Sequence, residues 1–224
     1  GAGATYNVAV SGMTGDGTVI ASLAAGVATD ALGNTSAAST STDNTVTRDT
    51  TGPTVTINQA AAQADPTNGS PIDFTVVFSE SVSNFATGDV TLGGTAGATT
   101  QVVTGAGTTY NVAVSGMTGD GTVIASLAAG VATDALGNPS AASTSTDNTV
   151  TRDTTGPTVT IDQAGAQPDP TNASPINFTV VFSVPVANFV TGDVTLGGTA
   201  GATTQVVTGA GTTYNVAVSG MTGD

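Results

Sequence analysis

The sequence has no cysteine, no histidine, no lysine and no tryptophan. The lack of cysteine excludes disulfides and thiolate-bound metals, and the lack of histidine as well makes zinc and copper poor candidates. Only two arginines stand against sixteen acidic residues, so the formal net charge is −14. A chain with this charge and no basic patch repels nucleic acid and anionic lipid and attracts divalent cations.

Charged residues are also scarce, at 8% of the chain, whereas hydrophobic residues make up 38%. This composition is too apolar and too weakly charged for intrinsic disorder. No hydrophobic run is long enough to span a membrane. The chain offers no histidine, cysteine or lysine as a catalytic base or nucleophile, which leaves only carboxylate pairs for hydrolytic chemistry. We therefore expect a folded protein that is not an enzyme, with no membrane insertion and no nucleic-acid partner.

The sequence repeats itself. The segment Thr47–Ile57 returns unchanged at Thr151–Ile161, and Tyr6, Tyr110 and Tyr214 begin three copies of one eleven-residue segment. Asp49 and Asp153 mark equivalent points 104 positions apart. A period of this size is that of one ordinary domain, so each unit can bury its own core. The predicted organisation is the second part of one repeat at 1–49, a complete repeat at 50–153 and the first part of the next repeat at 154–224.

Strand patterns dominate the complete repeat. Between residues 72 and 78 apolar and polar residues alternate, which places Ile72, Phe74, Val76 and Phe78 on one face. Glycine and aspartate turn signals, such as Gly105-Ala106-Gly107, separate short segments rich in β-branched residues, and we interpret 125–132 as a strand that runs into a loop. The predicted strands are 54–57, 72–78, 82–85, 89–92, 99–104, 109–115, 122–127 and 148–152. This pattern predicts an all-β protein built from antiparallel β-sandwiches.

The motifs of the unit occur in a recognisable order. They are Asp-Thr-Thr-Gly-Pro-Thr-Val-Thr-Ile at 49–57, Asp-Pro-Thr-Asn at 65–68, Phe-Thr-Val-Val-Phe-Ser at 74–79, Gly-Asp-Val-Thr-Leu at 88–92, Tyr-Asn-Val-Ala-Val at 110–114 and Asp-Ala-Leu-Gly-Asn at 134–138. This order resembles the bacterial immunoglobulin-like tandem repeats of giant extracellular surface adhesins. The resemblance implies tandem immunoglobulin-like sandwiches stacked end to end, an extracellular stalk on a bacterial surface, and calcium at or near the domain junctions. It does not imply catalysis.

Carboxylates at both ends of each unit are the candidate calcium ligands. Calcium takes six to eight oxygen ligands, and carboxylates that gather at a junction without a cation repel one another. In a sandwich of this kind, the loop at 65–68, the turn at 119–121 and Asp153 lie at one end. The loop at 134–138 lies at the other end, where Asp49 of the preceding unit enters. The candidate ligands are Asp16, Asp49, Asp65, Asp120, Asp134, Asn138, Asp153 and Asp169.

A simpler interpretation is that these residues form turns, since aspartate and asparagine beside glycine favour turns without any metal. Glu80 cannot serve a role that every repeat must perform, because Val184 occupies the equivalent position in the next repeat. Arg48 and Arg152 either pair with a carboxylate across the junction or stay exposed. Tyr110 is expected to pack in the core rather than to form a ligand platform.

The linkers between successive repeats are predicted to be stiff. Gly52-Pro53 restricts the backbone where one unit passes to the next, and proline at the start of a strand need not donate to the sheet. We interpret the chain as a spacer in a bacterial cell-surface fibre or adhesin, of the kind involved in cell adhesion and biofilm, with adjacent repeats as partners. The alternatives are a subunit of a multi-chain extracellular filament or sheath, with other copies of the fibre as partners, and a module that binds glycan or itself through threonine-rich faces.

Overall fold

The computed structural model describes residues 3–223 and consists of strands with one short 3-10 helix, η1 (Thr191–Asp193). It divides into two compact units, of which the first ends at Thr154 and the second begins at Thr155. No helix in the part of the chain that the structure describes is long and apolar enough to cross a membrane.

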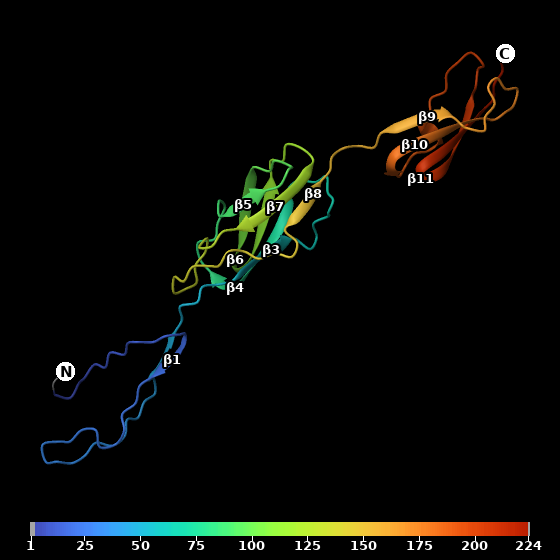
Figure 1. Cartoon of the computed structure of the whole chain (residues 1–224). Coiled ribbons are helices and arrows are strands. Elements are labelled where there is room, and N and C mark those ends of the chain that lie inside the picture. Colours follow the sequence, from blue (N-terminus) through green and yellow to red (C-terminus); the bar gives the residue numbers. More distant parts are fainter. Residues whose placement is uncertain (1–2, 224) are drawn as a thin grey trace. The chain divides into compact units, whose positions relative to one another are not determined.

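Residues 50–153, all of which are described, form two antiparallel three-stranded sheets that face each other (Figure 1). One sheet has the order β3-β4-β6 and the other the order β5-β7-β8. One hydrophobic core, with side chains from both sheets, lies between them, so the predicted sandwich is present. The strands are β3 (Val55–Gln59), β4 (Ile72–Val82), β5 (Val90–Gly93), β6 (Thr100–Ser115), β7 (Gly121–Leu127) and β8 (Thr149–Arg152).

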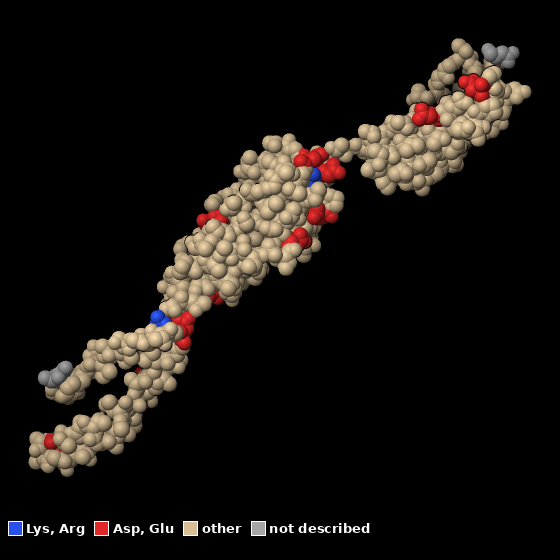
Figure 2. Space-filling model, in the orientation of Figure 1, with Lys and Arg blue, Asp and Glu red and all other residues tan. Residues whose placement is uncertain are grey.

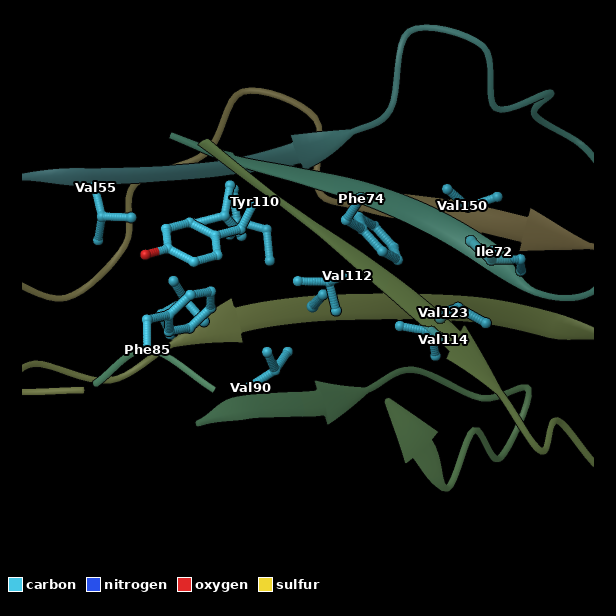
Figure 3. Close-up of a cluster of buried hydrophobic side chains, with 14 of the residues drawn as sticks. Val55, Ile72, Phe74, Phe85, Val90, Tyr110, Val112, Val114, Val123 and Val150 are labelled. Carbon is cyan, nitrogen blue, oxygen red and sulfur yellow. The ribbon is translucent and has the colours of Figure 1, made fainter. Parts of the chain in front are cut away.

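The predicted alternation in β4 is confirmed. Ile72, Phe74, Val76 and Phe78 are buried, whereas Val77 between them is 42% exposed. Figure 3 shows Ile72 and Phe74 directed into the layer between the sheets. Because successive side chains of a strand point to opposite faces, one run of residues supplies both a core face and a solvent face.

Three aromatic rings close one end of this core. Phe78, Phe85 and Tyr110 meet edge to face, with ring centroids 5.0 to 5.9 Å apart. The Tyr110 hydroxyl donates to the carbonyl of Val82 at 3.4 Å, and Tyr110 is 6% exposed. Figure 3 shows its ring beside Phe85. The predicted packing role of Tyr110 is therefore confirmed, since a buried tyrosine needs one partner for its hydroxyl and this carbonyl supplies it.

The strand count differs from the prediction. Residues 50–153 contain six strands rather than seven or eight. The segments predicted at 99–104 and 109–115 form one continuous strand, β6, and the sequence at 105–107 is not a turn. Gly105 and Gly107 have φ values of 123° and 72°, and the pairing of β4 with β6 shifts register here. The two glycines thus adopt positive φ inside a strand, opposite a register shift between Val77 and Val82 of β4, where the sequence pattern indicated a break.

A second difference concerns the segment predicted as a strand at 82–85. Instead, β4 continues to Val82, and Phe85 lies outside any strand although its side chain is buried. Because β4 continues to Val82, Glu80 lies within this strand, although the strand was predicted to end at Phe78.

The flanking parts contain equivalent pieces of the same architecture. In β1 (Gly17–Ile20) and β2 (Thr45–Arg48), Gly17 pairs with Arg48, as Gly121 pairs with Arg152 in β7 and β8. The second unit has the sheet β11-β10-β9, in which Ile176 pairs with Val218 as Ile72 pairs with Val114. Its strands are β9 (Val159–Gln163), β10 (Ile176–Val186) and β11 (Thr204–Ser219).

Neighbouring valines on β4 give a direct test of the two faces. Val76 is fully buried and Val77 is 42% exposed. We expect Val76→Ala to lower the free energy of unfolding of this domain by about 2 kcal/mol, because it removes buried methyl groups and leaves a cavity. Val77→Ala is the matched control and should change it by less than about 0.5 kcal/mol. Urea denaturation followed by circular dichroism measures both, and equal losses would contradict the assigned faces.

Candidate metal centre

The linker between β2 and β3 is built into the complete domain. Pro53 is almost fully buried, and its carbonyl accepts a hydrogen bond from the amide of Ala141 at 2.9 Å. Gly52 lies against Pro139, so closely that a Cβ atom at this position would be 1.8 Å from the Pro139 carbonyl oxygen. The predicted stiff linker thus has a structural basis, because residues 52 and 53 pack as part of the fold.

Hydrogen bonds from Thr50 and Thr51 tie the other end of the linker to the preceding strands. The Thr50 amide and hydroxyl donate to Oδ1 of Asp16 at 2.8 and 2.6 Å, and the Thr51 hydroxyl donates to Oδ2. Arg48 Nη1 lies 3.7 Å from the same carboxylate. These donors, led by the hydroxyl groups of Thr50 and then Thr51, hold the pKa of Asp16 below its ordinary value. Asp16 therefore anchors the linker.

The loop at 134–138 organises a buried carboxylate. Asp134 is 4% exposed, and its Oδ1 accepts the amides of Leu136 and Asn138, each at 2.8 Å. Its Oδ2 accepts the Asn138 side-chain amide, also at 2.8 Å. Burial opposes ionisation of Asp134, but the hydrogen bonds from Asn138, Leu136 and Gly137 outweigh it and lower the pKa below its ordinary value. Asp134 is therefore held as a carboxylate.

Asn138 links this loop to the linker. Its Nδ2 also donates to the backbone carbonyl of Asp49 at 3.4 Å. Asp49 in turn accepts the Thr51 amide on Oδ1 at 3.0 Å. The structure thus brings together Asp49, Asp134 and Asn138, the three residues that sandwich topology placed at this end.

Glu80 completes a cluster of three carboxylates. One oxygen each from Asp49, Glu80 and Asp134 lies within 4.8 Å of the other two. Glu80 reaches this point because β4 extends beyond Phe78, and because Ser79 pairs with Thr54, directly after the linker. Sequence reasoning missed Glu80, because Val184 replaces it in the next repeat and the strand was predicted to end before it.

The spacing of these oxygens suits a hard divalent cation. Oxygens that bind one calcium ion at 2.3–2.6 Å lie no more than about 5 Å apart. Asp49 and Glu80 are half-buried and Asp134 is buried, so water screens their mutual repulsion less than at an open surface. A cation removes this repulsion, and Asp49, Glu80 and Asp134 are the residues that would hold it.

The opposite end of the domain contains the other predicted ligands but gathers them differently. Asp65 Oδ1 accepts the Thr151 amide at 2.9 Å, and Asp120 Oδ1 accepts the amide and hydroxyl of Thr154 at 2.8 and 2.6 Å. The Asp153 amide donates to the Thr67 carbonyl, so Asp65, Asp120 and Asp153 lie at one end, as the topology predicted. Asp169 is exposed in the second unit. Among residues 3–223, only Asp49, Glu80 and Asp134 form a group of three potential metal-binding side chains.

Both arginines pair with a carboxylate of their own repeat. Arg48 Nη1 lies 3.7 Å from Asp16 and Arg152 Nη1 lies 3.7 Å from Asp120. Each Nη1 also donates to a backbone carbonyl, that of Gly15 or Gly119, at 2.8 Å. In Figure 2 each blue arginine surface lies directly beside red carboxylates. The arginines thus reinforce the turns that hold Asp16 and Asp120.

The packing of the linker against Pro139 can be tested at Gly52, and the same chain provides a control. We expect Gly52→Ala to lower the free energy of unfolding by about 1–3 kcal/mol, because the new methyl group forces the linker away from Pro139. Gly156 is the equivalent residue after the complete repeat, and a Cβ there meets nothing within 4 Å. Gly156→Ala should therefore change stability by less than about 0.5 kcal/mol in the same urea titration. Similar effects of both substitutions would contradict the steric assignment.

The pKa of Asp134 provides a second test. With a chelator present, we expect a carboxyl NMR titration to give an Asp134 pKa below the ordinary 3.8, and Asn138→Ala to raise it. Because the folded-state pKa is depressed, ionised Asp134 stabilises the loop at and above the ordinary pKa. This stabilisation is lost as the pH falls through the folded-state pKa. Asn148→Ala is the control, because Asn148 donates to the Ala125 carbonyl instead. An Asp134 pKa unmoved by Asn138→Ala would contradict the assigned cause.

Comparison with known families identifies the complete repeat. Residues 49–151 match the family model described as a bacterial Ig-like domain. No curated protein matches the sequence. Domains of this family are typical of surface proteins and usually non-catalytic, and no catalytic family was found for the chain. Together with the observed two-sheet sandwich, this match shows that residues 49–151 are a bacterial Ig-like domain.

Proposed function

We propose that this chain is a spacer segment of a long fibre on a bacterial surface, in which calcium stiffens the junctions between successive Ig-like domains. The observation that carries this proposal is the linker between β2 and β3. It packs against the complete domain through Gly52 and Pro53, and it has no free length to act as a flexible tether. A spacer that extends a fibre and carries force along it needs junctions that resist bending.

The junction carries contacts on both sides of the linker. Asp16 binds Thr50 and Thr51 from the side of β1 and β2. Asn138 binds the Asp49 carbonyl from the side of the complete domain. Between these two anchors lie only a few residues, so bending at the junction has to break hydrogen bonds or displace a buried proline.

Calcium is proposed to lock the junction from the side of the complete domain. Asp49 belongs to the linker, Glu80 to β4 and Asp134 to the 134–138 loop, so one ion would tie three separate segments together. Without a cation, the same three carboxylates repel one another, and this repulsion opposes the packing of the linker against the domain. The site has few protein ligands and lies near solvent, which matches the weak calcium affinity of extracellular modules, about 10⁻⁴–10⁻³ M.

Calorimetric titration of calcium into the chelator-treated chain tests this site. We expect binding in the range of about 10⁻⁴–10⁻³ M, and a loss of at least about tenfold in affinity for Glu80→Val, which removes a charged ligand. Valine is a suitable replacement, because Val184 occupies the equivalent position in the next repeat and the strand there keeps its pairing.

Asp89→Asn is the matched control, because it removes one negative charge from a turn in which Asp89 accepts the Ala86 amide. This variant should bind calcium as the unchanged chain does. If Glu80→Val and Asp89→Asn have the same affinity as the unchanged chain, Glu80 is not a ligand. If the unchanged chain binds no calcium at millimolar concentration, the proposed locking of the junction is wrong.

A further inference from the structure

The loop between β3 and β4 contains the only asparagine in the sequence that is followed by glycine, Asn68-Gly69. The equivalent loop between β9 and β10 reads Asn172-Ala173. Both asparagines are exposed. Both loops therefore expose the same residue, which glycine follows in one loop and alanine in the other.

One local hydrogen bond is the same in both loops. The Gly69 amide donates to the Thr67 hydroxyl at 3.1 Å, and the Ala173 amide donates to the Thr171 hydroxyl at the same distance. Within the described residues, neither the Asn68 nor the Asn172 side chain makes a hydrogen bond. The asparagines at 138 and 148, in loops, and at 58, in β3, by contrast, use their side chains to bind Asp134, the Ala125 carbonyl and the amide of Asp147. The Asn68 and Asn172 amides are thus free to react.

We propose that Asn68 is a site of spontaneous deamidation and that the residue after the asparagine sets its rate in each repeat. The Gly69 backbone nitrogen loses its proton to a base in solution and attacks Cγ of Asn68. A bond forms between this nitrogen and Cγ, Nδ2 takes up a proton from solvent, and the bond from Cγ to Nδ2 breaks so that ammonia leaves. Water then opens the succinimide at either carbonyl to give aspartate or isoaspartate.

Glycine favours this reaction for a steric and a conformational reason. It has no Cβ beside the attacking nitrogen, and its backbone reaches conformations closed to other residues, which ring closure needs. Alanine at position 173 adds a methyl group and restricts the backbone. The structure itself leaves room for either residue, since a Cβ at Gly69 would contact only the Thr67 hydroxyl oxygen at 3.3 Å.

The two aspartates followed by glycine are less suited to the same ring closure. Asp16 and Asp120 precede Gly17 and Gly121, but both accept hydrogen bonds from threonine hydroxyls and lie 3.7 Å from an arginine. An ionised carboxylate in such contacts is a poor electrophile. The neutral, exposed amide of Asn68 is therefore the reactive position of this chemistry in the complete domain.

Deamidation of Asn68 changes the loop next to a structural contact. Thr67, the preceding residue, donates to the Thr151 carbonyl and accepts the Asp153 amide, which joins this loop to β8. The reaction adds a negative charge to a chain that already has a net charge of −14. The isoaspartate product also lengthens the main chain one residue after Thr67. Repeats with glycine here would age faster than repeats with alanine.

Incubation of the whole chain at slightly alkaline pH, followed by peptide mapping that separates aspartate from isoaspartate, tests this proposal. We expect the peptide with Asn68 to convert at least about tenfold faster than the peptide with Asn172, a barrier difference of about 1.4 kcal/mol. The expected products have the mass of an NH₂ group exchanged for OH, with isoaspartate among them.

Reciprocal variants separate the chemistry from the position in the chain. Gly69→Ala should slow Asn68 to the rate of Asn172, and Ala173→Gly should bring Asn172 to the rate of Asn68. Each variant only introduces the residue that the other repeat already has, so both are expected to fold. Equal rates at Asn68 and Asn172 in the unchanged chain, or an Ala173→Gly variant that does not accelerate Asn172, would overturn the proposal.

Discussion

The close packing of Gly52 against the Pro139 carbonyl is the constraint on which the junction depends. The linker enters the complete domain here, and no side chain fits between its backbone and the loop after residue 138. Pro53 follows directly, is buried, and fixes the backbone at the start of β3. With the backbone held at 52 and 53, Asp49 is kept within reach of the 134–138 loop, and Asn138 binds its carbonyl. The position of the carboxylates thus follows from steric contact in the main chain.

Electrostatic repulsion acts against this packing. Asp134 is buried and held ionised by donors of its own loop, so its charge does not depend on a metal. Asp49 and Glu80 bring two further carboxylates to within 4.8 Å of it. Because these carboxylates are at least half-buried, their repulsion opposes the packing of the linker against the domain unless a cation lies among them. The proposed role of calcium rests on this repulsion. An ion that binds more tightly when the linker is packed against the domain than when the linker is free shifts the population toward the packed form.

Much of this architecture could be predicted from the sequence, because it rests on local patterns. The alternation at 72–78 predicted the buried face of β4, and the order of the strands placed Asp49, Asp134 and Asn138 at one end of the sandwich. Gly105 and Gly107 misled the prediction, since glycine with positive φ serves bulges and turns alike and only pairing with β4 distinguishes them. Glu80 was missed for a related reason. Its place depends on how far β4 continues, which tertiary pairing decides and local sequence does not.

If calcium suppresses bending where the linker enters the complete domain, small-angle X-ray scattering of the whole chain should detect it. The measurement compares the maximum dimension and its distribution in calcium with those in excess chelator. We expect a longer and narrower distribution in calcium than in chelator, with most of the difference lost in Glu80→Val. An identical distribution in both solutions would contradict it, and would mean that the packing of Gly52 and Pro53 alone sets the stiffness of the junction.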